Sequence, residues 1–380
     1  MTSTNNQEKK DQKDQDDELN DIAPDGKDQD DELNDIAPNG RKRDWAGKKL
    51  SNELLAQAYD SIDSTKAERL RGCGRYLTFR LYDDGTKKLD SMYSCRVRLC
   101  PMCTWRRSLK VYGQTMRILQ EISKSFKYQY IMLTLTVKSC RGDELSRNID
   151  NMMSAYNRLM GYADIKRACK GWYRSLEVTH DCTPKITDDM YYGNADKHIK
   201  SRRNYYRKMC LHIGDNNPSY DTYHPHFHVL IAVNPSYFTS RYYINHVQWC
   251  KLWKRACRLD YIPQVDVRQV KGETDKDLQK AVCEVAKYAA KDTDYIVLDN
   301  WDLTVGTVKM LDKALNGRRL VAYGGLLKDI KALLKLDDEE TGDLVHVDGD
   351  VDDNEDNYSL ITYWWWTGYR QYYLGDNPNE

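Results

Sequence analysis

Hydrophobic and polar positions along the middle of the chain predict a β-sheet with helices packed across it. Residues 128–137, Tyr-Gln-Tyr-Ile-Met-Leu-Thr-Leu-Thr-Val, form an apolar and β-branched run that is typical of a buried strand. The predicted strands comprise residues 128–137, 172–179, 226–233 and 262–270. The predicted helices comprise residues 144–170, 238–258 and 275–291. This order of elements predicts an α+β or α/β domain built on one sheet.

Both ends of the chain lack this patterning and are acidic. Residues 13–26 and 27–40 form a tandem repeat whose two copies differ only at Asp25 and Asn39. Neither copy is apolar enough to form a core, so we predict disorder for residues 1–44. We interpret residues 336–380 as a second tail, disordered where it is acidic, whose aromatic end could dock onto the body of the protein.

The formal net charge of zero conceals three blocks of opposite sign. Residues 1–40 carry 4 Lys and 13 Asp or Glu, and residues 331–380 carry 3 Lys or Arg and 13 Asp or Glu. The segment 41–330 therefore carries 51 Lys or Arg and 32 Asp or Glu, a net charge of +19. A basic centre between acidic ends favours a polyanionic partner, although a solvated basic surface explains the charge equally well.

The sequence predicts neither export nor a membrane. The first 18 residues are polar and acidic, unlike a secretory signal, and no apolar run reaches the roughly 18–20 residues that cross a bilayer. We therefore expect a cytoplasmic location and no membrane partner. Cytoplasmic thiols stay reduced, so a cluster among the 11 cysteines indicates metal binding rather than disulfides.

Two histidines at the start of a predicted strand are the first candidates for chemistry. Residues two apart in a strand face the same side, so His226 and His228 would present two imidazoles on one face while Phe227 points to the other. Two imidazoles within reach of one ion begin a metal site, whereas a lone histidine is more often a core residue. His224 has the same parity but ranks second, because Pro225 marks the strand start.

A carboxylate on a neighbouring strand would complete this site. Glu177 lies between Leu176 and Val178, so we expect its side chain on the face opposite to these apolar neighbours. Such a polar position is usually just exposed to solvent. Beside a strand that carries two histidines, it becomes the natural third ligand.

The predicted helix at residues 275–291 carries a second set of reactive groups. Glu284, Tyr288 and Lys291 are three or four residues apart and would share one helical face. A Tyr hydroxyl has an unperturbed pKa of about 10 and needs a nearby cation or base to act as a nucleophile. Lys291 and Glu284 would supply these groups. The alternative is an ordinary ion pair beside an interfacial tyrosine, in a chain that has 28 tyrosines.

Four cysteines cluster ahead of the first predicted strand. Cys100 and Cys103 form a C-x-x-C knuckle, Cys95 and Cys73 lie upstream, and four thiolates would make a closed tetrahedral zinc site. The spacing is irregular for a zinc ribbon, so buried reduced thiols are the alternative.

Arginines near the knuckle and in the segment 200–223 could contact DNA, or could belong to a solvated surface. They are Arg96, Arg98, Arg106, Arg107, Arg202, Arg203 and Arg207.

Three of these features, in this order, resemble the motifs of one protein family. Residues 131–136 (Ile-Met-Leu-Thr-Leu-Thr), then His226-Phe227-His228, then Tyr288-Ala289-Ala290-Lys291, are similar to the motifs of the replication initiators (Rep proteins) of rolling-circle plasmids from Gram-positive bacteria. These initiators belong to the HUH endonucleases, named for the His-hydrophobic-His motif. The resemblance covers roughly residues 70–330. Each motif alone is common, and only the three in order are specific.

The resemblance implies a fold and a division of the chain. It implies an α+β fold, the HUH-endonuclease fold, with a central antiparallel sheet flanked by helices. We therefore predict a Cys-rich, zinc-like DNA-binding module at residues 45–115 and an HUH endonuclease catalytic domain at residues 116–335. The tails at residues 1–44 and 336–380 lie outside both.

The resemblance also implies metal-dependent nicking of a plasmid double-strand origin at a single-stranded, hairpin-borne site. A divalent ion, Mg²⁺ or Mn²⁺, held by His226, His228 and Glu177 would polarise the scissile phosphate. Tyr288 would attack that phosphate and form a 5′-phosphotyrosine, so that the strand can later be closed without ATP. Glu284 matches the carboxylate that activates water to end the cycle. A host helicase is a candidate partner.

Several alternative interpretations stay open. An HUH transposase shares the motifs, whereas a conjugative relaxase is disfavoured because its tyrosine usually precedes the histidine motif. From another class, the chain could be a zinc-stabilised DNA-binding regulator without catalysis. A metal hydrolase of small molecules fits poorly with the basic centre. Tyr295 is the alternative nucleophile, but no lysine follows it at the spacing of Tyr288 and Lys291.

Overall fold

The computed structural model describes residues 27, 31–37, 40–193, 199–270, 275–286, 290–347 and 358–377. The chain forms two units, one from residues 1–106 and 343–380 and the other from residues 107–342. This division joins the two ends of the chain, which the sequence analysis treated as separate segments. The mixed composition of helices and antiparallel sheets agrees with the expected fold class.

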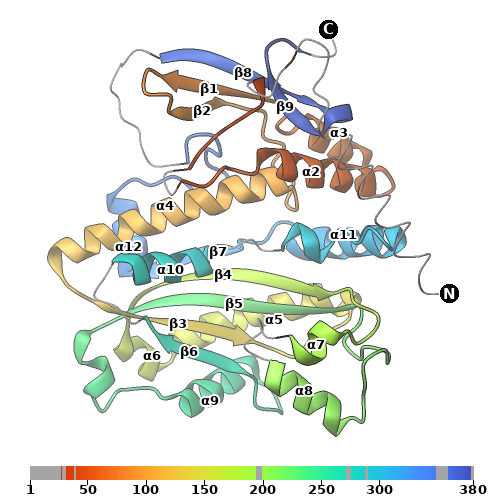
Figure 1. Cartoon of the computed structure of the whole chain (residues 1–380). Helices are drawn as coiled ribbons and strands as arrows, with labels where there is room; N and C mark the ends of the chain where they lie inside the picture. Colours follow the sequence, from red (N-terminus) through yellow and green to blue (C-terminus); the bar gives the residue numbers. More distant parts are fainter. Residues whose placement is uncertain are drawn as a thin grey trace. The chain divides into compact units, whose positions relative to one another are not determined.

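The unit formed by residues 107–342 is built on a five-stranded antiparallel sheet in the order β6-β3-β5-β4-β7 (Figure 1). Its strands are β3 (Gln129–Thr136), β4 (Cys169–Asp181), β5 (Thr222–Val233), β6 (Val265–Gln269) and β7 (Val321–Gly325). The first four correspond to the four predicted strands. The fifth, β7, was not predicted, and it adds the edge next to β4.

Strand β5 begins at Thr222 rather than at the predicted His226, so Pro225 lies inside the strand. Its pairing with β3 ends at His226, whereas its pairing with β4 continues to Thr222. Pro225 thus lies where β5 has a partner on one side only. A proline, which lacks a backbone N–H, is tolerated at such an edge. This correction brings His224 into the strand.

Helices cover both faces of this sheet (Figure 1). On one face, Phe227 of β5 packs between Tyr156 of α5 and Trp253 of α9. On the other, Leu230 and Ala232 belong to an apolar cluster with residues of α4, α10 and α12. The helices are α4 (Pro101–Ser125), α5 (Gly142–Gly161), α6 (Ala163–Ala168), α7 (Asp188–Tyr192), α8 (Ile199–Lys208), α9 (His246–Cys257), α10 (Asp275–Val285), α11 (Trp301–Leu315) and α12 (Leu326–Leu333), with 3₁₀ turns η2 (Pro235–Thr239) and η3 (Asp292–Asp294).

Two predicted helices are shorter than expected. The helix predicted at 238–258 begins only at His246, because Asn245 and Gln248 form a capping box that fixes its start. The helix predicted at 275–291 ends at Val285. The region predicted as one helix at 144–170 contains α5 and α6, and its last two residues already belong to β4.

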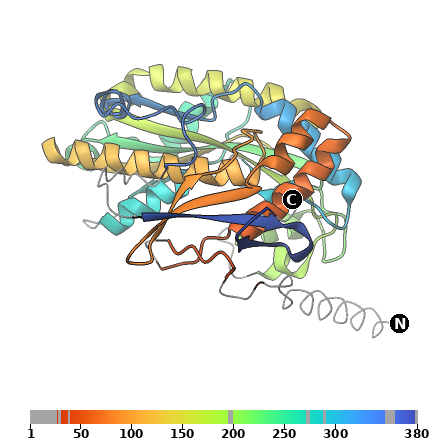
Figure 2. The same cartoon turned by 90° about the horizontal axis from the view of Figure 1, so that it is seen from above.

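The other unit contains a four-stranded antiparallel sheet in the order β2-β1-β8-β9. Its elements are α2 (Trp45–Asp60), α3 (Ser64–Gly72), β1 (Tyr76–Tyr82), β2 (Lys87–Ser91), β8 (Tyr358–Trp366), η4 (Thr367–Tyr369) and β9 (Gln371–Leu374). Strand β8 pairs along the whole of β1, so the blue C-terminal strand lies beside the orange one (Figure 2).

The predicted C-terminal tail is therefore wrong for residues 358–377. Tyr363 and Trp365 of β8 are buried, and the ring of Tyr363 packs edge-on against Phe79 of β1. Alternate aromatic residues thus form the inner face of a strand, which gives this segment a partner that lies almost 300 residues earlier in the chain. The acidic residues 348–357 lie outside the described residues.

The predicted disorder of residues 1–44 is also wrong for part of the second repeat copy. The Leu33 N–H donates to the Tyr372 carbonyl (3.0 Å), and the Leu33 side chain is buried. Buried Asp35 accepts from the Trp45 indole (2.7 Å) and from Arg43 (2.8 Å). These contacts hold the segment 31–37 onto α2 and β9. The first copy lies outside the described residues.

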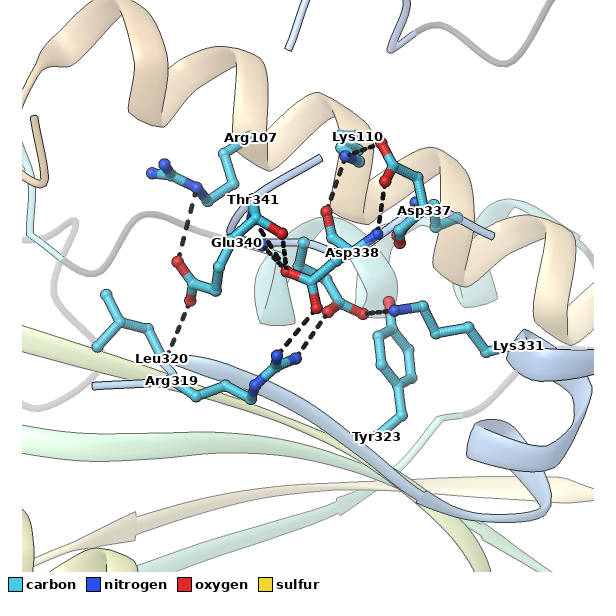
Figure 3. Close-up of polar contacts among 12 residues, drawn as sticks. Arg107, Lys110, Arg319, Leu320, Tyr323, Lys331, Asp337, Asp338, Glu340 and Thr341 are labelled. Carbon is cyan, nitrogen blue, oxygen red and sulfur yellow. Dashed lines mark hydrogen bonds and ion pairs between the residues drawn. The ribbon is translucent and has the colours of Figure 1, made fainter. Parts of the chain in front are cut away.

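The acidic residues 337–340, predicted as part of the tail, make ion pairs in the unit formed by residues 107–342 (Figure 3). Glu339 is 1% exposed and pairs with Arg319 (3.3 Å) and with Lys331. Asp337 and Asp338 pair with Lys110 (2.6 Å) and Arg319 (2.9 Å) respectively. This part of the acidic block neutralises basic side chains of its own unit.

We expect Glu339→Ala to lower the free energy of unfolding by about 1–3 kcal/mol. The change leaves Lys331 without its carboxylate partner, and the value allows for the solvent exposure of Arg319. Chemical denaturation of the full chain measures it. Asp299→Ala, at an exposed position, is the control and should change the stability by less than about 0.5 kcal/mol. Equal stability of the two variants would contradict the prediction.

Candidate metal and catalytic site

Three side chains that the sequence analysis selected converge on one face of the five-stranded sheet. Glu177 of β4 lies directly opposite His226 of β5, and Ser175 lies opposite His228. Because paired residues of antiparallel strands share a face, Glu177 and both histidines point to the same side. All three are buried, with 5–8% of their surface exposed.

The distances bring the three groups to one point. Glu177 Oε2 lies 3.3 Å from His226 Nε2 and 2.7 Å from His228 Nε2. One carboxylate and two imidazoles are a donor set that divalent metals accept, and together the three form a group whose ligand atoms lie within 4.8 Å of one another. These residues could therefore hold a metal ion, and the donor set does not identify which one.

Contacts behind the rings fix how His226 presents its nitrogens. His226 Nδ1 lies 3.0 Å from the His224 carbonyl oxygen, which can only accept, so Nδ1 carries the proton. The other ring nitrogen, Nε2, faces Glu177, where a metal ion would replace the proton between them. Among the described residues, the buried Nδ1 of His228 has no hydrogen-bond partner.

The charge states of Glu177 and His224 suit a site that binds a cation. Burial alone raises the pKa of Glu177, but hydrogen bonds from His226 and His228 outweigh it and hold this pKa well below the usual range. Burial, together with the neighbouring His226, lowers the pKa of His224 to about 4. Glu177 is therefore an anion and His224 a neutral imidazole at neutral pH.

The end of α10 lies beside this site because the sheet caps it. The last carbonyls of a helix lack partners within the helix. The carbonyl of Val285 accepts from Ser175 Oγ (2.6 Å) and from the Tyr173 hydroxyl (3.2 Å), and both donors lie on the face of β4 that carries Glu177. The cap anchors the helix end at Ser175, the residue that pairs with His228.

The predicted helical face of Glu284, Tyr288 and Lys291 requires a correction. The helix ends at Val285, and Lys291 has an extended backbone where it precedes η3. Tyr288 itself lies outside the described residues. The side chain of Lys291 nevertheless reaches the site, with Nζ 3.9 Å from Glu177 Oε1. Glu284 is half-buried in the last turn of α10.

The alternative nucleophile Tyr295 is 1% exposed and packed in the core. Its hydroxyl is not presented to a DNA strand in this conformation, so the structure disfavours it.

The predicted DNA-contacting arginines fall into two groups. Arg106 is 1% exposed and donates to the carbonyls of Leu344 (3.0 Å) and Val345 (2.6 Å), and Arg107 is buried 3.9 Å from Glu340. Their guanidinium groups are used in packing, so we withdraw both as DNA contacts. The others are exposed or half-buried: Arg96, Arg98, Arg202, Arg203 and Arg207.

The four predicted zinc ligands, Cys73, Cys95, Cys100 and Cys103, are all buried and form a second group of ligand atoms, in the other unit.

Comparisons with known proteins agree on one family. The model of the replication protein family Rep_1 matches residues 86–373. The chain belongs to this family. The match confirms the resemblance to the replication initiators of Gram-positive plasmids and extends it beyond residue 330, to include β8 and β9.

Curated relatives support the assignment along most of the chain. "Protein rep" of Bacillus amyloliquefaciens is 36% identical over 359 residues, which cover 88% of this chain and 94% of the relative. "Protein rep" of Streptococcus pneumoniae serotype 2 is 35% identical over 327 residues, 85% of this chain and 89% of the relative. A "Replication protein" of Staphylococcus aureus is 34% identical over 258 residues, 67% and 94% respectively. No solved structure matches the chain.

Membership in the replication protein family supports a role as a plasmid replication initiator that binds origin DNA. Within the described ranges, none of the helices is both long and apolar enough to cross a bilayer.

The sequence analysis missed residues that shape the site of this replication protein. Ser175 positions the end of α10, and its parity with Glu177 on β4 was the available signal. A hollow of about 370 Å³ next to the histidines is lined by His180, Arg202 and His224, among others. His180 is held there by Asp221 (3.1 Å), a contact that no local pattern reveals.

We expect His228→Ala and Glu177→Gln each to weaken the binding of Mn²⁺ by about tenfold or more, because each change removes one of three ligands. Isothermal titration of the full chain with Mn²⁺ measures this loss. His212→Ala, at an exposed position away from the sheet face, is the control and should bind as wild type does. Unchanged affinity in both site variants would show that these residues do not hold the ion.

Proposed function

We propose that this replication protein nicks the double-strand origin of its plasmid through a covalent bond between Tyr288 and the 5′ phosphate, and later closes the strand. The observation that carries the proposal is the convergence of Glu177, His226 and His228, together with the contacts of Val285 and Lys291, which lie three positions before and after Tyr288 in the sequence. A protein that only binds DNA has no need for a buried carboxylate and two imidazoles directed at one point.

A divalent cation, Mg²⁺ or Mn²⁺, bound by these three residues would act as a Lewis acid on the scissile phosphate. The chain's own residues prepare the site for it. The carbonyl of His224 orients the ring of His226, and the two imidazoles keep Glu177 ionised. Lys291 adds a positive charge next to Glu177, at the edge where a phosphate would enter.

Two residues that flank Tyr288 in the sequence contact the candidate site. Val285 is hydrogen-bonded to Ser175, and Lys291 reaches Glu177. Tyr288 is three positions from each of them in the sequence. The contacts of these two sequence neighbours with the site support Tyr288 as the nucleophile.

The nicking step conserves the number of phosphodiester bonds. The Tyr288 oxygen forms a bond to phosphorus while the bond to the 3′ oxygen of the neighbouring nucleotide breaks. The phenolic proton leaves with a base or water, and the 3′ oxygen takes up a proton. Because the phosphotyrosine retains the bond energy, attack by a 3′ hydroxyl closes the strand without ATP.

The final cleavage requires a different nucleophile. We propose that Glu284, half-buried in the last turn of α10, accepts a proton from water. Hydrolysis at that step in place of a second covalent attack would end the cycle after one round.

The DNA strand would run along the end of β4 and β5 that carries the histidines. The hollow there is lined by Arg202 and His224, and Arg207 is exposed on α8. The guanidinium of Arg203 packs over the ring of Tyr192 and donates to the Tyr191 carbonyl. We therefore assign Arg203 a role in holding these aromatic residues and not in contacting the DNA. Basic and aromatic side chains of this kind bind single strands by charge and by stacking.

Tyr288→Phe should abolish both nicking and the covalent adduct on a supercoiled plasmid that bears the protein's own origin, in the presence of Mg²⁺ or Mn²⁺. Nicked circles are measured on gels and adducts by mobility shift after denaturation. Tyr295→Phe is the matched control and should keep both activities. An adduct formed by Tyr288→Phe would assign the nucleophile elsewhere. Origin binding by wild type without any nick would favour a regulator over an enzyme.

Glu284→Gln should leave the first nick unchanged and impair termination, so that single strands longer than one plasmid unit accumulate. A replication assay with purified polymerase and helicase measures the length of the displaced strands. Asp277→Asn, two turns earlier on α10, is the control for loss of a carboxylate from that helix. Unit-length products from Glu284→Gln at the wild-type rate would exclude this role for Glu284.

A further inference from the structure

The cluster of Cys73, Cys95, Cys100 and Cys103 has no place in the nicking reaction, and it lies entirely within the unit that contains the four-stranded sheet. Three separate pieces of chain supply its cysteines. Cys73 caps the end of α3, Cys95 lies in the irregular segment 92–100, and Cys100 and Cys103 flank the start of α4. None of the four is more than 1% exposed.

The structure assigns to these four residues a structural Zn²⁺ site in which each cysteine supplies one thiolate. Cys73 Sγ lies 3.5 Å from Cys103 Sγ and 3.6 Å from Cys100 Sγ, and Cys95 Sγ lies 3.8 Å from Cys103 Sγ. A tetrahedral ion with Zn–S bonds of about 2.3 Å places its sulfurs about 3.8 Å apart. The sulfurs are too far apart for disulfides, whose S–S distance is about 2.05 Å.

Backbone donors directed at the sulfurs point to anionic thiolates. The N–H of Arg96 donates to Cys103 Sγ (3.3 Å), that of Cys95 to Cys73 Sγ (3.4 Å), and that of Cys103 to Cys100 Sγ (3.5 Å). Arg96 adopts a left-handed backbone, φ 57°, a conformation that costs energy outside glycine. Its N–H contact to sulfur is a reason for the chain to adopt that conformation.

A buried lysine supplies charge compensation near the cluster. Lys49 is 1% exposed, and its Nζ donates to the carbonyls of Arg71 (2.7 Å) and Cys73 (3.1 Å). Four thiolates around Zn²⁺ carry a net charge of −2, so a cation held next to them is stabilising. Lys49 Nζ also lies 3.9 Å from Glu53 Oε1, so the lysine has a carboxylate partner besides the cluster.

The ion would fix a loop that has no regular structure of its own. Segment 92–100 contains neither helix nor strand, yet it presents exposed Arg96 and half-buried Arg98. Cys95 precedes Arg96 and Cys100 follows Arg98, so bonds from these two cysteines to one ion would fix the loop on either side of the two arginines. The site also reaches the C-terminal sheet, because the Tyr372 hydroxyl of β9 donates to the carbonyl of Gly74, next to Cys73. Zinc would thus stabilise the loop and the sheet together.

One contact belongs to the competing state of reduced thiols without metal. The Cys100 thiol donates to Asn52 Oδ1 (3.1 Å), a bond that a thiolate cannot make. The two states differ in metal content, in the reactivity of the thiols and in spectroscopy, so they are separable by experiment.

The test is the metal content of the full chain, purified under reducing conditions without added metal and measured by inductively coupled plasma mass spectrometry. We expect about one zinc per chain in wild type and less than about 0.2 in Cys73→Ser and Cys103→Ser. Cys257→Ser, outside the cluster, should keep the zinc. His226→Ala should also keep it, which separates this site from the proposed catalytic one.

Replacement of zinc by Co²⁺ in the wild-type chain should produce intense sulfur-to-cobalt charge-transfer absorption. This readout needs no variant, so it holds even if the serine substitutions fail to fold. A wild-type chain without zinc that gives no such absorption with Co²⁺ would overturn the proposal in favour of buried thiols. Zinc lost in His226→Ala but retained in both serine variants would overturn it as well.

Discussion

The register of β4 against β5 is the constraint on which the candidate site depends. Glu177 lies opposite His226 because Leu176 lies opposite Phe227, which packs against α5 and α9. A shift of the pairing by one residue would either turn Glu177 into that apolar layer or expose Phe227 on the polar face. Burying an unpaired carboxylate is far costlier than losing a few contacts. The apolar face of the sheet therefore specifies the geometry of the polar face.

The face of the sheet that carries the histidines is divided between an apolar part and the candidate metal site. Along β5, Leu230 and Ala232 belong to an apolar cluster with residues of α4 and α10, whereas His226 and His228 face Glu177 on the same side of the sheet. The cap of Val285 by Ser175 sets where that helix stops. The end of α10 thus separates the apolar core from the polar site.

Much of this arrangement was predictable because it depends on local periods. Alternation with a period of two identified the strands, and it placed Glu177 on the face of His226 before any pairing was known. The end of α10 was not predictable, since the helical spacing of Glu284 and Lys291 persists beyond the residue where a distant strand caps the helix. The pairing of β8 with β1 was missed for a related reason. Its alternating aromatic residues are a strand signal, but the partner lies almost 300 residues away and an acidic stretch precedes it.

The meaning of the basic central segment depends on which of its charges are paired in the folded protein. The net charge of +19 over residues 41–330 counts Arg319 and Lys110, yet these side chains pair with residues 337–339 of the following acidic block. Charges that are neutralised within a unit contribute little to attraction at a distance. A strand of DNA would meet arginines such as exposed Arg96 and half-buried Arg202, which lines a hollow together with His224. Arg96 follows Cys95 in the sequence, and Arg202 lines the same hollow as His224, so each lies close to a group of residues that could hold a metal ion. Position, more than total charge, therefore favours DNA as the partner.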